Sequence, residues 1–480
     1  MLSFAVQMHG RHGWAAAVLV ALVAMVEPAL AAEFSVQSDT IGQAYRIRGR
    51  DGLFTIPRSR LTQLLSLYGT DLLGKAGDPG SYRELSIVLN FSLDHDFGVQ
   101  SSSLDPHDEA SFIPHLSRTQ VGLLTGHLSG RFGLDPSFTF SLGRVFLLDP
   151  AGFAAMDGLK LGLRVARVLS LQLAAGLELA PDMRLSVADF SPEGVSWGNR
   201  DGYPAGVHPE VIIARPRPLL VAALGLGIPG AGSITISYRS TWQDPHFKHV
   251  SLERLGLGLD VSGPGLPLSV RIRSAFDLVW RRFSEIDAEV EVLPHALVGF
   301  GIRFLHLLPL FDSASIFNVF DIDPHDEVGA FVTLGKPRSS RLTLAAGAFL
   351  RLTDVSEHDP EGDDRLSDAG GWLVIRARLN PVEVAWSARG SGGESGVLAG
   401  TRLQASILLL DGRLVPSAGL GLWFWDDPLR REHYGLTTGG SAILRWRVVR
   451  PVLLVAGLDV YNNRVSGTGL AGNVRLVVEF

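Results

Sequence analysis

The segment Leu268–Trp280 decides the fold class, and it reads LSVRIRSAFDLVW. Apolar side chains occupy alternate positions along most of it, and Arg271 and Arg273 stand between them. Because successive side chains of a β-strand point to opposite faces, this alternation predicts a strand with one apolar and one polar face. The same period of two recurs at Leu85–Leu93 and Leu159–Val165. The chain is therefore expected to be all-β.

The apolar content of the chain is spread over strands rather than collected in helical spans. The 480 residues have a positive mean hydropathy of +0.21 and are 19% charged. The one continuous apolar run, Trp14–Val26, is shorter than the ~20 residues that a transmembrane helix needs. It follows Arg11 and precedes a small-residue cleavage pattern ending at Ala31, which predicts a secretory signal peptide over residues 1–31. An uncleaved anchor is the alternative interpretation.

Composition and motifs exclude several function classes. The chain has no cysteine, which excludes disulfides, thiolate metal sites and cysteine nucleophiles. A net charge of -6 argues against a nucleic-acid partner. No Gly-x-Ser-x-Gly stands in a strand–turn–helix context, and no His-Glu-x-x-His occurs. We therefore expect neither an enzyme nor a cofactor.

An alternating strand can belong to a soluble sandwich or to a membrane barrel. In a barrel, the apolar face contacts lipid and the polar face lines the lumen. The alternating segments run to about 10–14 residues, and a tilted span needs about 9–11. Glycine is abundant at 54 residues and often stands on the polar face, as at Gly256, Gly258 and Gly419. These features favour a transmembrane β-barrel over residues 32–480.

The last residues of the chain carry a resemblance to a known class. Val474, Leu476, Val478 and Phe480 alternate with more polar residues, and Phe480 is the final residue. This resembles the terminal strand of Gram-negative outer-membrane β-barrels, which the barrel-assembly machinery recognises. The resemblance implies a porin-like barrel in the outer membrane, in contact with lipid and lipopolysaccharide. It covers the class and implies no particular solute or oligomeric state.

Turn positions allow the strands to be counted. Bacterial barrels have an even strand number with short periplasmic turns and longer outer loops, and these constraints give about 22 strands (range about 18–24), beginning near Gln43 and without a plug domain. We predict periplasmic turns near Gly77-Asp78, Asp135-Pro136, Ala166-Arg167, Pro229-Gly230, Gly263-Pro264, Pro294-His295, Gly335-Lys336-Pro337, Asn380-Pro381, Asp411-Gly412 and Val449-Arg450.

The long connections all fall on the other side of the predicted barrel. They include residues 95–118, 181–217, 309–326 and 354–370, and we assign Arg184–Ala188 to one of these outer loops. An Asp-Pro-His sequence recurs in these loops, at 105–107, 244–246 and 323–325. Carboxylates beside a histidine could bind a divalent cation. Hydrated turns explain the same residues, and we predict no metal site.

The polar faces of the strands suggest what lines the lumen. If one turn lies at Arg281–Ser284, Arg273 stands across from Glu291. Arginine dominates the inner face of the C-terminal half. We predict a channel for small hydrophilic solutes. Like charges in a pore bias ion selectivity, and a basic wall would favour anionic solutes. Mixed charge that only solvates a wide lumen explains the same residues. The alternative is a non-conducting structural or surface-interaction barrel closed by its own outer loops. The predicted lining residues are Arg271, Arg273, Glu289, Glu291, Arg376, Arg378, Arg402, Arg445, Arg447 and Arg475.

Overall fold

The structure is a computed structural model, and it describes most of the chain between Glu33 and Glu479. The described residues are 33–48, 55–72, 83–97, 119–166, 168–179, 217–242, 247–248, 250–263, 266–295, 297–308, 324–335, 340–354, 365–394, 396–426, 434–463 and 467–479. Several predictions concern residues outside this part. They are the signal peptide, Phe480, Arg184–Ala188 and most of the long outer loops.

Every regular element of the described chain is a β-strand. The 22 strands are β1 (Glu33–Arg48), β2 (Thr55–Thr70), β3 (Arg83–Asp96), β4 (Thr119–Phe132), β5 (Ser137–Asp149), β6 (Gly152–Val165), β7 (Leu169–Glu178), β8 (Arg217–Ile228), β9 (Gly232–Trp242), β10 (Val250–Val261), β11 (Leu268–Asp277), β12 (Arg282–His295), β13 (Val298–Leu307), β14 (His325–Leu334), β15 (Leu342–Asp354), β16 (Arg365–Leu379), β17 (Val382–Gly393), β18 (Gly396–Ile407), β19 (Leu414–Asp426), β20 (Tyr434–Val449), β21 (Val452–Asn463) and β22 (Gly467–Glu479). A search of the described residues finds no helix with the length and apolar character to cross a membrane.

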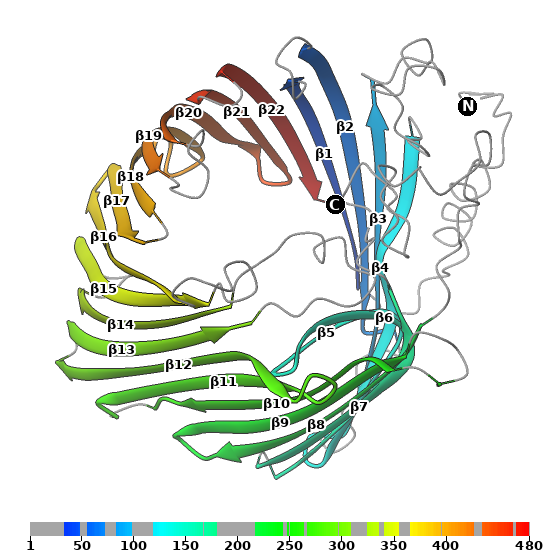
Figure 1. Ribbon diagram of the computed structural model, residues 1–480. Helices are drawn as coiled ribbons and strands as arrows, with labels where there is room; N and C mark the ends of the chain where they lie inside the picture. The colour runs from blue at the N-terminus through cyan, green and yellow to red at the C-terminus, as the bar shows by residue number, and fades with distance from the viewer. Residues whose placement is uncertain are drawn as a thin grey trace, which may run out of the picture.

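The strands form one closed antiparallel barrel. Each strand pairs with the next along the chain, and β22 pairs with β1 to close the ring, as Figure 1 shows. An ion pair marks this seam on the inner face, where Arg475 Nη2 lies 2.5 Å from Asp39 Oδ2. Closure leaves no free edge at the two ends of the chain, which a sheet surrounded by lipid requires.

The two faces of the barrel differ in polarity. Large apolar side chains are exposed all round the outer face, for example Leu350 at 64% and Leu420 at 66%. The alternate positions of the same strands carry small or polar side chains, such as Arg351 and Gly421. An apolar exterior around a polar interior is the arrangement of a barrel in lipid, because lipid rather than protein covers the apolar face.

The strand count agrees with the structure, and a turn follows each even-numbered strand from β2 to β20, as predicted. Pro294-His295 form the end of β12 rather than the turn itself, and Gly77-Asp78 lie outside the described residues. The prediction that the barrel begins near Gln43 is wrong, because β1 starts at Glu33. The first half of β1 places polar Ser38 and Thr40 on the outer face, so the apolar alternation is interrupted there. Both hydroxyl groups share hydrogen bonds with Gln63 of β2.

The predicted register of β11 and β12 is also wrong. Arg273 stands opposite Asp287, not Glu291, and Arg271 stands opposite Glu289. The turn lies at 278–281, before the position we expected. It is held there by Asp277, whose carboxylate accepts hydrogen bonds from two backbone N–H groups of the turn. The register of β11 and β12 also shifts after Ala275, and this shift contributes to the difference between the predicted and observed partners of Arg273.

Candidate functional site

The inner wall of the barrel carries all ten residues that the sequence analysis selected. Strand pairing places each of them on the face opposite to the exposed apolar side chains. Three of the predicted assembly-signal residues, Val474, Leu476 and Val478, stand on the outer face of β22. A shared face is a structural fact, and the roles in conduction and assembly stay predictions.

The densest positive charge lies on β16 to β20. Arg376, Arg389 and Arg402 occupy inward positions of three adjacent strands. Arg402 pairs with Ser387, two residues from Arg389 on β17, and Arg376 pairs with Ala385, four residues from Arg389. We call these three residues the arginine patch. No carboxylate of the described chain lies within salt-bridge distance of the patch or of Arg445 on β20. Their charge is therefore not neutralised by a neighbouring side chain in that part of the protein.

Other inward arginines are paired with acids. Arg271 lies 3.8 Å from Glu289, and Arg378 lies 3.4 Å from Glu383. Asp287 stands opposite Arg273 but accepts two hydrogen bonds from Arg303 of β13, at 2.8 and 3.0 Å. Its carboxylate is therefore paired with Arg303 rather than with Arg273. The arginine-rich wall is thus partly neutralised, and the unneutralised part is concentrated at the patch.

One aromatic ring ties the patch to the neighbouring ion pair. The guanidinium carbons of Arg351 and Arg389 each lie 5.5 Å from the ring centroid of Phe349. Phe349 is buried, and Arg351 also forms an ion pair at 2.6 Å with Glu327. Stacking on an aromatic face restricts where a guanidinium can move. Arg389 is therefore held in place without losing its charge.

A hairpin folded into the barrel is the main feature that the sequence analysis did not find. Strand β5 pairs with β4 only as far as the pair Gly126–Arg144, and β6 pairs with β7 only as far as Met156–Glu178. The intervening residues 145–155, here called the inner hairpin, pair with one another, and Val145 pairs with Met156 at the base. Gly143 has a φ of +125°, a conformation that favours glycine, and it marks the bend. In Figure 1, β5 curves inside the ring of strands.

The tip of the inner hairpin is fixed to the inside of β9. Asp149 Oδ1 accepts a hydrogen bond of 3.0 Å from the Ser237 hydroxyl, and the hydroxyl oxygen of Ser237 accepts one of 3.1 Å from Ala151 N. Arg239 donates to the carbonyl groups of Gly152 and Phe153 at 2.5 and 2.7 Å. Its guanidinium also lies 3.5 Å from Asp149, and both side chains are almost fully buried. The tip is therefore docked by polar contacts that water does not reach.

Apolar packing completes this docking. Val145 and Leu147 of the inner hairpin, with Met156 at its base, join Leu219 and Val221 of β8 in a cluster buried to 4% exposure or less. The hairpin thus lies with its inner face against the inner wall, and it narrows the lumen. A signal for this existed in the sequence, since residues 145–156 are apolar on both faces. An ordinary lumen-facing strand would be polar on one of them.

The described residues contain no group of three His, Asp or Glu side chains that could bind a metal ion. Two of the Asp-Pro-His sequences lie outside that part of the chain. At the third, His325 begins β14, and the neighbouring Asp326 contacts His306 at 2.7 Å. The predicted outer loop therefore ends before these residues.

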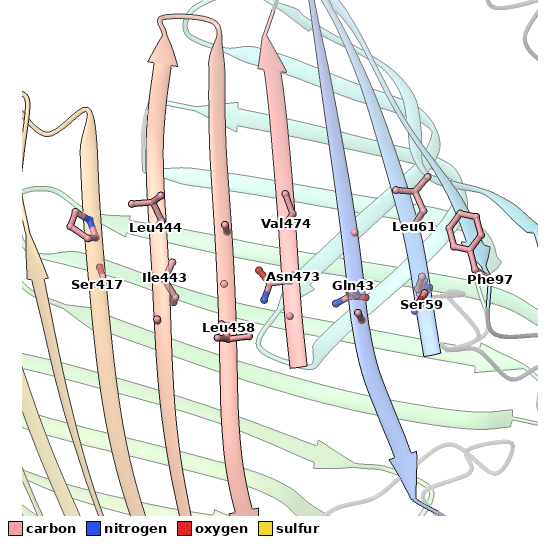
Figure 2. A pocket seen from close by; sticks show the side chains of 18 residues that line it. Gln43, Ser59, Leu61, Phe97, Ser417, Ile443, Leu444, Leu458, Asn473 and Val474 are labelled. Atoms are coloured by element: carbon pink, nitrogen blue, oxygen red, sulfur yellow. The ribbon is translucent and has the colours of Figure 1, made fainter. Parts of the chain in front are cut away.

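A groove of about 800 Å³ lies on the outer face of the barrel, across the seam from β19 to β2. Small residues such as Gly42, Ala44 and Gly472 form its floor, and Figure 2 shows Leu444 and Leu61 along it. Because this face is apolar and lies in the membrane, the groove belongs to the lipid-covered surface and not to the lumen.

These observations define the class of the protein. A closed antiparallel barrel of 22 strands, with an apolar exterior and a charged interior, is a porin-like β-barrel of the Gram-negative outer membrane.

Comparisons with known proteins find similarity only among solved structures. No protein-family model matches the sequence, and no curated protein matches it. Among solved structures, the chain is similar to OccAB4 of Acinetobacter baumannii, with 10% identity over 93% of this chain and 98% of that one and a TM-score of 0.42. OccK9 (OpdG) of Pseudomonas aeruginosa gives the same values. OccAB2 of Acinetobacter baumannii is 6% identical over 93% and 98%, with a TM-score of 0.43. Such values support no argument about function.

Proposed function

We propose that the protein is a passive outer-membrane channel for small hydrophilic solutes, with a preference for anions. The observation that carries this proposal is the arginine patch, together with Arg445. These guanidinium groups project from the inner wall and have no carboxylate partner among the described residues. Unneutralised like charge in a narrow aqueous passage attracts counter-ions and repels co-ions.

The inner hairpin supports a restricted passage rather than a wide hole. A barrel of this strand number encloses a large lumen, which must be narrowed before wall charges act on a passing solute. The hairpin narrows it from the β8–β10 side. Screening shortens electrostatic reach to about 8–10 Å at physiological ionic strength, so the width of the passage decides whether the patch matters.

Planar-bilayer recording of the purified protein tests the proposal. We expect discrete conductance steps, and a reversal potential in a salt gradient whose sign shows anion preference. Conductance with cation preference would contradict the selectivity. Absence of any conductance would contradict the channel and favour the alternative, a barrel closed by its own outer loops.

A further inference from the structure

Among the described strands, the wall of the barrel is interrupted beside the inner hairpin. Residues 119–125 of β4 pair with β3 on one side, and on the other side they pair with no described strand. The missing partner is β5, which leaves the wall after Arg144 and turns inward. We call this interruption, between 119–125 of β4 and the outer ends of β6 and β7, the wall break.

The position of the wall break in the membrane follows from strand geometry. The paired stretch Gly126–Phe132 below it is seven residues long. At about 3.4 Å per residue and a tilt of about 45°, it spans about 17 Å of an apolar band about 25 Å tall. The break therefore begins past the middle of the membrane and opens at the level of the outer leaflet.

Arg144 forms the lower boundary of the break. Its guanidinium donates hydrogen bonds of 2.8 and 2.9 Å to the two carboxylate oxygens of Asp157. It also donates to the carbonyl oxygen of Leu123, a group that a continuing β5 would have satisfied. A backbone group left unpaired in lipid costs several kcal/mol, so this bond makes the end of the ladder stable. The break is thus a built feature of the wall.

The surfaces at the break are apolar and exposed. Phe146 and Phe153 of the inner hairpin stack with their ring centroids 5.7 Å apart, and Leu148 beside them is 82% exposed. Across the break, Val121 of β4 is 55% exposed. The hairpin rings lie on the face opposite to the one buried against β8, so they point away from the wall behind them.

The same face of β5 carries apolar side chains below and above the ion pair of Arg144 and Asp157. Phe138, Phe140 and Leu142 occupy alternate positions on the outer face of β5, in the lipid. Past the bend at Gly143, the same face carries the ion-paired Arg144 and then Phe146 and Leu148 within the barrel. Above this ion pair, an apolar chain in the break could contact Phe146 and Leu148 on the side of the lumen and Val121 on the side of the lipid.

We propose that the wall break is a lateral portal, through which amphiphiles with a single apolar chain pass between the lumen and the outer leaflet. This activity is separate from the passage of hydrophilic solutes, and it does not depend on the arginine patch. The polar lumen accommodates the head group, and the apolar face of the inner hairpin accommodates the chain.

Uptake of labelled laurate by Gram-negative cells expressing the protein tests the portal, with butyrate as the short-chain comparison. Placing a carboxylate on the apolar route costs more free energy than a tenfold change in rate corresponds to. Leu148→Asp and Phe153→Asp should therefore each lower laurate uptake about tenfold. Uptake of butyrate should not change. Both positions are exposed, so the variants should fold. The matched control is Leu134→Asp, an equally accessible leucine in the periplasmic turn of the same strand pair, at 56% exposure.

Laurate uptake that equals the empty-vector level, or that is unchanged in both variants, would overturn the portal. A parallel fall of laurate and butyrate would overturn it as well, because it would indicate one shared hydrophilic route. A diazirine analogue of laurate gives an independent reading on the purified protein. Labelling should concentrate at Phe146, Leu148 and Phe153, and equal labelling of the lipid-facing Leu420 would count against the portal. Loss of ion conductance with intact labelling would contradict the channel alone.

Discussion

At the scale of single residues, the inner hairpin depends on the bend at Gly143. Its φ of +125° lies in a region that side chains with a Cβ rarely adopt. A Cβ added there would also overlap the backbone carbonyl of Gly126. The positive φ and the close approach to Gly126 both arise because β5 separates from β4 at this point. Gly143 therefore lies where the hydrogen-bond ladder between β4 and β5 ends and where the chain changes direction.

Substitution at this bend should be costly. Gly143→Ala should lower the free energy of unfolding by about 3 kcal/mol or more, because backbone strain and steric overlap add. Gly230→Ala is the matched control: Gly230 also has a positive φ, of +73°, but no atom lies within 4 Å of an added Cβ. Its cost should be only about 1 kcal/mol. Urea unfolding of the refolded barrel measures both, and equal losses would contradict the role given to Gly143.

At the scale of elements, the sequence predicted the strands far better than their special features. Alternation of apolar and polar residues is imposed by the membrane, so it marks the strands and their faces reliably. The register of β11 and β12 was missed because Asp277 ends the strand through its side chain, a local effect without a period. The inner hairpin was missed because Asp149 and Arg239 are 90 residues apart along the chain and meet only through the closed ring.

The docking of the inner hairpin can be tested at Arg239. Arg239→Met leaves the buried Asp149 carboxylate without its cation, which should cost about 3–5 kcal/mol. The double variant Arg239→Met, Asp149→Leu removes both charges and should recover much of that loss. Hydrogen exchange of residues 145–155 reports hairpin release directly. Unchanged exchange in the single variant would show that the ion pair does not hold the hairpin.

A carboxylate at an outer turn gives a pH-dependent prediction. Glu394, between β17 and β18, accepts hydrogen bonds from Ser367 N at 2.7 Å and Ser367 Oγ at 3.0 Å, and these bonds lower its pKa below the ordinary value. A lowered pKa in the folded state means that this contact stabilises the fold above the ordinary pKa. The contribution is lost as pH falls through the folded pKa.

Hydrogen exchange at the Ser367 amide, followed from neutral to acidic pH, measures this contact. Protection corrected for the intrinsic exchange rate should fall only below the ordinary pKa of a glutamate, about 4.3. Glu394→Gln should remove the step, because its amide does not titrate. A step that persists in the Gln variant would assign the effect to another group.

At the scale of the whole molecule, closure of the ring turns separate strands into one charged passage. Arginines on β16 to β20 are distant from the inner hairpin along the chain, yet both face the same lumen. The apolar exterior fixes which face is inner, and the hairpin reduces the space that the charges must influence. Under the proposed function, selectivity would be a property of the assembled barrel and not of any single strand.

The arginine patch should set the sign of that selectivity. In the triple variant Arg376→Gln, Arg389→Gln, Arg402→Gln, the lumen loses unneutralised positive charge, so the reversal potential in a salt gradient should move away from anion preference. The effect should weaken as salt rises, because screening shortens the reach of the charges. Arg413→Gln, in the periplasmic turn between β18 and β19, removes charge outside the patch and should have little effect. If the two variants shift the reversal potential equally per charge removed, net charge and not the patch determines selectivity. If neither shifts it, the passage is too wide for wall charges to act.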